Sequence, residues 1–177
     1  VMPSILERIK PPRFAKRTFY LDRFGARSDG RTDCTQAFRS AIDRCSKAGG
    51  GKVVVPPGTY LTGAIHLKSN DNLHIQKDAT VKFSTNPKDY LPLVYTRWEG
   101  MELMHLSPLI YAYEQTNIAI TGEGTLDGQA DSAHWWPWKG NTAFGWVSGA
   151  AQQKPGRDRL FQMHPETGRQ RPLPRPG

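Results

Sequence analysis

Apolar residues between positions 34 and 47 recur every three to four residues, the spacing of one face of an α-helix. Asp33 is suited to cap the start of this helix, with Gln36 in the capping-box position three residues later. The glycine run 49–51 favours a left-handed end to the helix. We therefore predict a helix over residues 34–47. Its apolar stripe consists of Cys34, Phe38, Ala41, Ile42 and Cys45.

From residue 52 onward the period changes to two, and short apolar or alternating runs are separated by turn residues. The pattern Asn-[Leu/Ile]-x-Ile-x-x-x-[Ala/Gly]-Thr-[Val/Leu] begins at Asn72 and again at Asn117. Short strands with a recurring unit are typical of the stacked coils of a parallel β-solenoid. A β-sandwich is the alternative, which the single helix and the repeat disfavour.

Two segments, 84–107 and 130–153, are too long to be simple turns between strands. Insertions of this kind project from one face of a solenoid and carry its binding groove. The chain thus divides into a lead of residues 1–17, a coiled region of residues 18–153, and a basic, Pro-rich tail. We expect this tail, residues 154–177, to be poorly ordered.

The chain of 177 residues has a net charge of +8, concentrated towards its two ends. This charge suits a polyanion, and an acidic polysaccharide fits as well as a nucleic acid. Aromatic residues are not interleaved with the basic runs, so we predict no nucleic-acid partner. No apolar run approaches the roughly 18 residues of a membrane span, so we predict no membrane partner, and the start of the chain lacks the apolar core of a signal peptide.

Cys34 and Cys45 are the only two cysteines. On one helix, their separation of eleven positions corresponds to roughly 16 Å, whereas a disulfide requires Cα atoms within about 7 Å. We therefore predict two buried, unpaired thiols.

Several motifs, in the same order, resemble the N-terminal part of bacterial glycoside hydrolase family 28, the polygalacturonases and their relatives. The resemblance extends from about residue 5 to 163, and its motifs are F-G-A-R-S-D-G-R-T-D (24–33), G-G-G-K-V-V-V-P-P-G-T-Y (49–60), D-Y-L-P-L-V-Y-T-R-W-E-G (89–100), N-I-A-I-T-G-E-G-T-L-D-G-Q (117–129) and W-W-P-W-K-G (135–140). It implies an all-β, right-handed parallel β-helix capped by the predicted helix. It also implies inverting hydrolysis of pectic α-glycosidic bonds, no metal or organic cofactor, and a secreted or periplasmic location.

In this family the chemistry lies in later segments, N-T-D-G, D-D, G-H-G and R-I-K, which we expect this chain to lack. Inverting hydrolysis needs two carboxyl groups about 6.5–9.5 Å apart. We therefore predict no catalytic residue and no metal ligand here, and interpret the chain as a truncated hydrolase that is inactive alone. The uncovered last coil is expected to favour self-association.

The candidate substrate contacts lie in the two insertions. Arg97 is suited to grip a uronate carboxylate, with Trp98 and Glu99 beside it; an Arg97–Glu99 ion pair that shapes the loop is the alternative. In the second insertion Trp135, Trp136 and Lys139 are candidates, because indole rings stack on sugars. Packing of the tryptophans against the coils is the alternative.

Asp127 precedes a glycine and is expected to serve in a turn rather than in catalysis. His66 and His74 fall within strand patterns and are expected on the coil faces. Two other functions remain open. A pectate lyase shares the β-helix but needs a cluster of acidic calcium ligands, which is not evident. A non-catalytic β-helix for glycan binding or adhesion would not need the missing motifs.

Overall fold

The computed structural model describes residues 5–98 and 100–163. It separates into two compact units. The first unit comprises Val1–Phe83 with Pro108–Asp127, and the second comprises Ser84–Ser107 with Gly128–Gly177. The first unit therefore holds the predicted coils, and the second holds the predicted insertions.

The first unit consists of four successive coils whose strands stack in parallel. In chain order the strands are β1 (Thr18–Tyr20), β2 (Asp29–Asp33), β3 (Gly51–Val55), β4 (Gly58–Thr62), β5 (Ile65–His66), β6 (Asp71–Ile75), β7 (Ala79–Phe83), β10 (Ile110–Tyr111), β11 (Ala119–Gly122) and β12 (Thr125–Asp127). They form three sheets, ordered β1-β3-β6-β11, β2-β4-β7-β12 and β5-β10. All the described pairings in this unit are parallel. The unit is thus a parallel β-helix, as predicted, and not a sandwich of antiparallel sheets.

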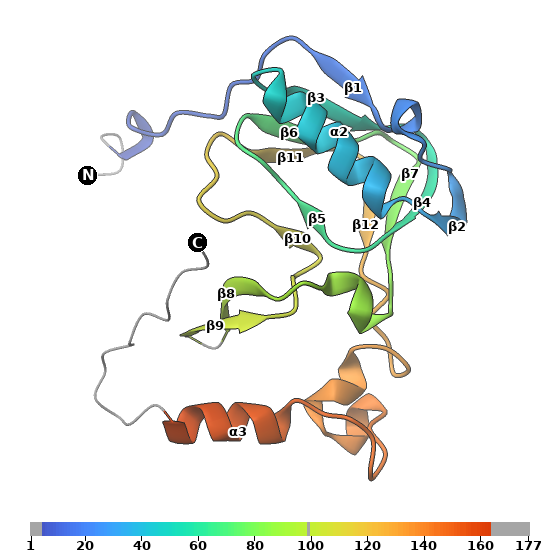
Figure 1. The fold of residues 1–177 in the computed structure, drawn as a ribbon, viewed down its shortest axis with the longest axis vertical. Coiled ribbons are helices and arrows are strands. Elements are labelled where there is room, and N and C mark those ends of the chain that lie inside the picture. The colour runs from blue at the N-terminus through green and yellow to red at the C-terminus, as the bar shows by residue number, and fades with distance from the viewer. Residues whose placement is uncertain (1–4, 99, 164–177) are drawn as a thin grey trace. The chain divides into compact units, whose positions relative to one another are not determined.

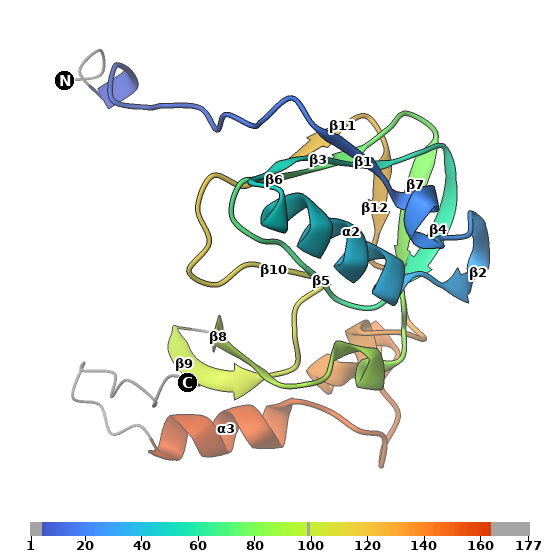
Figure 2. The same cartoon turned by 45° about the horizontal axis from the view of Figure 1, so that its top comes forward.

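Helix α2 (Thr35–Lys47) lies across the strands of the first unit, as Figures 1 and 2 both show. It packs against β1, β3, β5 and the 3-10 helix η1 (Leu21–Phe24). Its buried face is the apolar stripe predicted from the sequence, and its end has the predicted left-handed conformation, with a φ of 86° at Gly49. Both cysteines are buried and unpaired, also as predicted.

The predicted capping box of α2 is wrong in detail. Cys34 is the residue before the helix, and its side chain makes no capping hydrogen bond. The Asp33 carboxylate instead accepts from the N–H and the hydroxyl of Thr35, at 2.9 and 2.5 Å. The Thr35 hydroxyl in turn accepts the N–H of Gly63, at 2.7 Å, and so joins the helix start to the second coil. Gln36 bonds within the helix rather than back to its start.

The sequence repeat aligns the residues that lie opposite each other in the sheet containing β12, but in the sheet containing β11 its alignment is displaced by two residues. In β12 Thr125 lies opposite Thr80, as the repeat predicts. In β11, however, the residue opposite Leu73 is Ile120 and not Ile118. The turn before β12 has two residues between Gly122 and Thr125, whereas the turn before β7 has four between Ile75 and Thr80. A displacement of two residues preserves which side chains face inward.

The short turn requires its glycines. Gly122 has a φ of 108°, and a Cβ there would lie 1.9 Å from the carbonyl oxygen of Ile75. A Cβ on Gly124 would lie 2.5 Å from the Gln76 carbonyl oxygen. Among the described residues no strand stacks on the outer side of β11 or β12, and Ile120 is 44 % exposed.

One carboxyl group lies inside this unit. Asp71, the first residue of β6, is fully buried, and neither of its carboxylate oxygens has a hydrogen-bond partner among the described residues. Burial raises the pKa of Asp71 to about 6, although the nearby Cys45 thiol and Lys68 act to lower it. Burial and the neighbouring carboxyl group likewise raise the pKa of the Cys45 thiol to about 12. Asp71 therefore keeps its proton up to mildly acidic pH.

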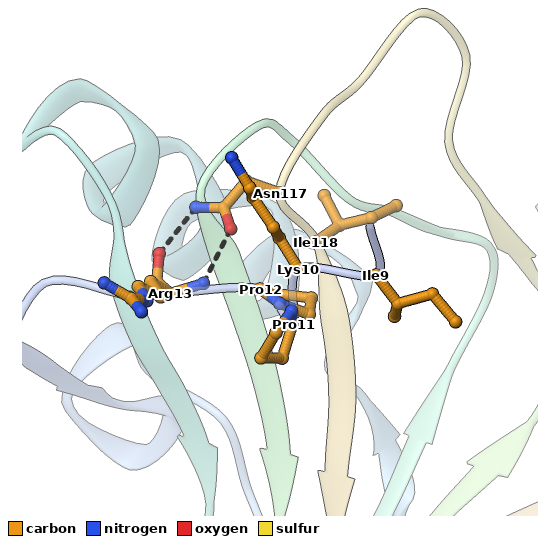
Figure 3. Close-up of a pocket in the computed structure, with 7 residues that line it drawn as sticks. All are labelled: Ile9, Lys10, Pro11, Pro12, Arg13, Asn117 and Ile118. Atoms are coloured by element: carbon orange, nitrogen blue, oxygen red, sulfur yellow. Dashed lines mark hydrogen bonds between the residues drawn. The ribbon is translucent and has the colours of Figure 1, made fainter. Parts of the chain in front are cut away.

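The segment before β1 runs along the outside of the coils and is here called the N-terminal arm (residues 9–17). The backbone N–H of Arg13 donates to Asn117 Oδ1 at 2.9 Å, and Asn117 Nδ2 donates to the Arg13 carbonyl at 2.7 Å (Figure 3). The Arg17 carbonyl accepts the N–H of Lys52, at 2.9 Å. Asn117 also donates to Asn70 Oδ1, at 2.9 Å. The arm therefore connects the second coil to the fourth.

The second unit contains both predicted insertions. The first insertion forms the 3-10 helix η2 (Pro87–Tyr90) and an antiparallel hairpin of β8 (Val94–Trp98) and β9 (Met101–His105). The second insertion forms two short 3-10 helices, η3 (Trp136–Lys139) and η4 (Thr142–Phe144).

Helix α3 (Lys154–Met163) corrects the expectation of a poorly ordered tail for its first ten residues. Pro155 lies in the first turn, where its missing N–H removes no helical hydrogen bond. No residue of α3 is buried. The remainder of the predicted tail, 164–177, lies outside the described residues. None of the described helices combines the length and apolar content needed to cross a membrane.

Candidate functional site

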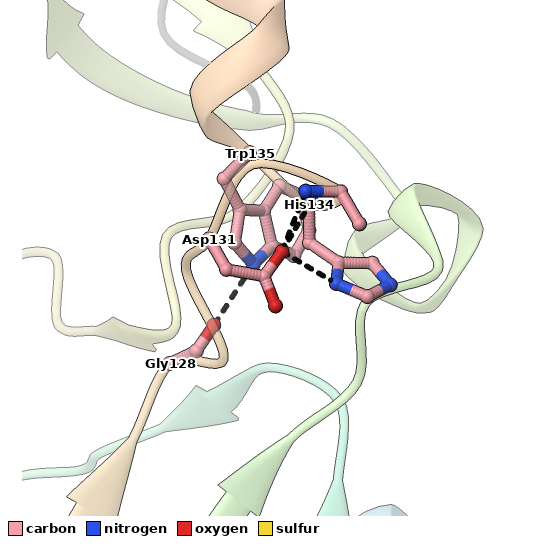
Figure 4. Close-up of polar contacts among 5 residues, drawn as sticks. Gly128, Asp131, His134 and Trp135 are labelled. Atoms are coloured by element: carbon pink, nitrogen blue, oxygen red, sulfur yellow. Dashed lines mark hydrogen bonds and ion pairs between the residues drawn. The ribbon is translucent and has the colours of Figure 1, made fainter. Parts of the chain in front are cut away.

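Trp135 is the centre of an aromatic cluster in the second unit. Its Nε1–H donates to the Gly128 carbonyl at 2.8 Å, as Figure 4 shows. Its ring meets Tyr90 edge-on at 5.7 Å and Trp138 edge-on at 5.1 Å. These contacts hold Trp135 at a φ of 62° and ψ of −50°, a backbone conformation that costs an L-residue about 1–3 kcal/mol. These are packing contacts, but they lie within the second unit, whereas the second alternative named packing against the coils.

Tyr90 anchors this cluster from the first insertion. The Tyr90 side chain is buried, and its hydroxyl donates to the Ser84 carbonyl at 2.6 Å. Burial raises the pKa of Tyr90 to about 12, so its hydroxyl stays protonated and remains a donor. The Tyr90–Trp135 contact therefore joins the two insertions within the second unit.

Asp131 and His134 form a polar pair beside the cluster (Figure 4). The Asp131 carboxylate accepts the N–H groups of Ala133 and His134, both at 2.8 Å, and lies 3.0 Å from His134 Nδ1. These bonds, led by that from Ala133, lower the pKa of Asp131. We did not select this pair from the sequence. An aspartate often accepts hydrogen bonds from backbone N–H groups of the residues that follow it in a turn, and His134 comes three residues after Asp131.

Trp136 and Lys139 occupy the outer side of the same loop. Trp136 is 49 % exposed, in contrast to its neighbour Trp135. The Lys139 ammonium group lies 4.6 Å from the centre of the Phe144 ring, a cation–π contact that restrains it. An exposed indole face beside a held cation has the chemistry needed to contact an acidic sugar.

Arg97 and Trp98 lie at the end of β8, in the hairpin. Arg97 Nη2 is 3.9 Å from Glu102 Oε1 on the facing strand, and both side chains are solvent-accessible. The ring of Trp98 stacks with that of His105 at a centroid distance of 6.3 Å. Glu99, the third candidate of this insertion, lies outside the described residues. The described acidic partner of Arg97 is therefore Glu102.

The remaining single residues lie on the coils. Asp127 is the last residue of β12, opposite Lys82 of β7, and so ends a strand. His66 lies in β5, where its ring meets that of Tyr111 at 5.1 Å. His74 lies in β6, and its Nδ1 is 2.8 Å from the Thr121 hydroxyl. Both histidines therefore belong to coil strands, as expected.

One expectation about the family segments is wrong. The sequence Arg-Ile-Lys is present, at residues 8–10, ahead of the predicted helix instead of after the other family segments. Lys10 lines a cavity of about 890 Å³ formed by the N-terminal arm and the start of β11 (Figure 3). Much of this lining is apolar, from Ile9, Pro11, Pro12 and Ile118. The triplet therefore matches the family segment in letters but not in position.

Comparison with known proteins agrees with the fold. Residues 21–89 match the family model described as rhamnogalacturonase A/epimerase, pectate lyase-like. The exopolygalacturonase of Thermotoga maritima, a solved structure, is 50 % identical in sequence with a TM-score of 0.88, over 91 % of this chain. The chain is homologous to the family 28 polygalacturonases.

Two curated relatives of this polygalacturonase homologue also carry the names of galacturonan-cleaving enzymes. The exo-poly-α-D-galacturonosidase of Dickeya chrysanthemi is 34 % identical over 116 residues, and a probable polygalacturonase of Vitis vinifera is 34 % identical over 122 residues. These alignments cover 61 % and 64 % of the homologue, but only 19 % and 24 % of the relatives. The homologue covers 36 % of the T. maritima chain. It thus spans about a fifth of the length of the curated relatives.

Proposed function

We propose that this chain contributes the capped first coils of a polygalacturonase-type hydrolase that acts on pectic polysaccharides by inverting hydrolysis of α-glycosidic bonds. The observation that carries the proposal is the similarity to the T. maritima exopolygalacturonase, at 50 % identity and a TM-score of 0.88 over 91 % of the chain. A likeness of this extent includes the insertions as well as the coils. The net charge of +8 also suits an acidic polysaccharide.

Within this function, the role proposed for the chain is to hold the substrate rather than to cleave it. Inverting hydrolysis needs one carboxyl group to protonate the leaving oxygen and another to activate water. The segments N-T-D-G and D-D, which supply such groups in the family, do not occur in the sequence, and neither does G-H-G. We therefore expect the isolated chain to bind pectic fragments without turnover.

The proposed substrate contacts are Arg97 and Trp98 of the hairpin and Trp136 and Lys139 of the second insertion. All four are accessible to solvent to some degree, and each has a cationic or aromatic group suited to a uronate ring. Trp135, whose indole N–H is bonded to Gly128, is assigned to positioning the loop instead.

The decisive experiment incubates the purified chain with polygalacturonate and follows two products. New reducing ends without ultraviolet absorbance would show hydrolysis and refute the proposed lack of turnover. Absorbance of a 4,5-unsaturated uronate would show a lyase and refute the hydrolase assignment. Neither product, together with binding to oligogalacturonate, is the expected result. Absence of binding would instead favour a β-helix for adhesion.

A pair of variants tests the assignment of the two adjacent tryptophans. Trp136→Ala is expected to weaken oligogalacturonate binding about tenfold without changing the melting temperature. The sugar ring buries apolar C–H groups against the indole, and roughly 60 Å² of such surface at about 25 cal/mol per Å² contributes about 1.5 kcal/mol. Trp135→Ala is expected to lower the melting temperature, because it removes a buried hydrogen bond and two aromatic contacts. Equal effects of the two variants on binding and melting would contradict the assignment.

We further propose a secreted or periplasmic location and self-association through the last coil. Exposed Ile120 and Leu126, at 44 % and 41 %, and the outer edges of β11 and β12 support the association. Sedimentation at several concentrations tests it, and a monomer at all of them would refute it. Cell fractionation of the source organism tests the location.

A further inference from the structure

A basic pocket of about 410 Å³ lies within the second unit, between the turn after η3 and the first turn of α3. Its volume is within the range of roughly 300–1,000 Å³ found for small-molecule sites. Three cationic side chains, one aromatic ring and two polar side chains line it. These are Lys139, Lys154, Arg157, Trp146, Asn141 and Thr142.

Local hydrogen bonds fix the walls of this pocket. The N–H of Gln153 donates to the Trp138 carbonyl at 2.7 Å and thereby holds the start of α3 against η3. Trp146 Nε1 donates to the Ala150 carbonyl at 3.0 Å. Between these ties Gly140 has a φ of 69°, and a Cβ there would collide with the side chain of Gln152. The pocket is therefore formed before a ligand arrives, which reduces the entropy cost of binding.

The charges around the pocket are unbalanced. The Arg157 guanidinium donates to Asp158 Oδ1 through Nε at 3.1 Å and Nη2 at 3.0 Å. Among the described residues, neither Lys139 nor Lys154 has an acidic group within the 4.0 Å of an ion pair. Three cations and one acid leave a net charge of +2 at a concave surface, which concentrates anions.

We propose that this pocket binds the carboxylate of a uronic-acid unit of an acidic polysaccharide. Lysine and arginine donate charge-assisted hydrogen bonds to a carboxylate. The amide of Asn141 and the hydroxyl of Thr142 supply neutral hydrogen bonds of the kind that sugar hydroxyls require. Trp146 supplies an apolar surface for the sugar ring. The class of ligand rests on the proposed function, whereas the site itself rests on the pocket.

The larger cavity at the N-terminal arm lacks this combination. Four of its seven lining residues are apolar, and the side-chain amide of Asn117 already bonds to the Arg13 backbone. It offers Lys10 and Arg13 but no aromatic ring. Lys10 therefore provides a matched control, because its removal takes one positive charge from a different cavity of the same chain.

The test measures binding of trigalacturonate to the full chain by calorimetry, with its fully methyl-esterified form as the uncharged counterpart. We expect the acid to bind at least about tenfold more tightly than the ester, because hydrogen bonds to charged groups contribute about 1.5–3 kcal/mol. Lys154→Ala and Arg157→Gln are each expected to weaken binding of the acid about three- to tenfold. Lys10→Ala is expected to leave it within about twofold, since Lys10 lines a different cavity and an exposed charge outside the pocket is largely screened by salt. Circular dichroism of each variant confirms that α3 is retained.

Three results would overturn the proposal. The first is equal affinity for trigalacturonate and its methyl ester. The second is an equal loss of trigalacturonate affinity in the pocket variants and in Lys10→Ala. The third is a complex with single-stranded DNA that is as tight as the trigalacturonate complex and as strongly weakened by the pocket variants. The last result would identify a general polyanion surface. If Arg157→Gln unfolds α3, Arg157→Lys provides the test, since it keeps the charge but loses the planar donor pair. Cleavage of polygalacturonate is scored separately. Turnover would refute the proposed lack of activity and leave the pocket standing, whereas an affinity that the pocket variants do not change would refute the pocket and leave the proposed function standing.

Discussion

Asp71→Asn would show how much an ionised carboxyl group costs inside the β-helix. The pKa of Asp71 is raised by burial from its ordinary value of 3.8 to about 6. Since one pKa unit corresponds to about 1.4 kcal/mol, the full difference amounts to about 3 kcal/mol. Below pH 3.8 the group is protonated in both the folded and the unfolded chain, and this cost is absent. As the pH rises from about 3.8 to 6 the unfolded chain releases the proton while the folded chain still holds it, so stability is lost over this range, and the loss is complete above 6.

The assay is urea unfolding of the native protein and of the variant, at about pH 4 and at about pH 7.5. The Asp71 contribution should destabilise the native protein by about 2 kcal/mol more at the higher pH than at the lower. Asparagine does not titrate, so the variant gains this amount relative to the native protein between the two conditions. Any constant cost of burying the amide is the same at both pH values and cancels in the comparison.

Asp158→Asn is the matched control. It removes the same charge from an accessible position on α3, where Asp158 pairs with Arg157 at 3.0 Å. A pair of this kind contributes only about 0–1 kcal/mol. If the Asp71→Asn variant differed from the native protein by the same amount at both pH values, the carboxyl group would not be titrating in the folded state near pH 6, and the reasoning from burial would be refuted.

Three further outcomes follow from the packing of the coils. Gly122→Ala is expected to lower the free energy of unfolding by about 3 kcal/mol or more, because the added Cβ collides with a neighbouring strand and the φ is strained for alanine. Gly149→Ala, with a φ of 86° but open space around it, should cost only about 1 kcal/mol. Thermal melts compare the two variants, and equal losses would contradict the close contact at Gly122. Asn117→Ala should speed proteolysis of the N-terminal arm, since both hydrogen bonds to its backbone are lost; an unchanged cleavage rate would count against the anchor. Cys34 and Cys45 should react with a thiol reagent only after denaturation, because burial raises the pKa of both thiols, and rapid reaction of the native protein would disprove this.

Elements whose apolar residues recur with a regular spacing could be predicted from the sequence. The stripe containing Phe38 and Ile42 identified α2, and the alternating runs identified the strands, because each pattern depends only on nearby residues. The position of β11 on β6 could not be predicted in the same way. The repeat aligned Ile118 with Leu73, but the shorter glycine turn places Ile120 there. Turn length, which the repeat ignores, decided the register.

The site residues show a similar division. The sequence placed Trp135 and Trp136 together, but only the tertiary contacts distinguish the bonded ring from the exposed one. Asp71 lies in the stretch Ser-Asn-Asp-Asn, whose composition suggests an exposed turn, and its burial beneath α2 has no local signal. Long-range packing thus governs the groups with unusual chemistry.

A stack of coils in which each layer touches only its neighbours can fray from either end. The N-terminal arm changes this, because Arg13 and Asn117 are joined across 104 residues of sequence. Loss of the fourth layer therefore releases the leading segment as well, and removal of that segment exposes the outer side of the fourth layer. The leading segment and the fourth layer are energetically linked, so this unit should melt as one block rather than layer by layer.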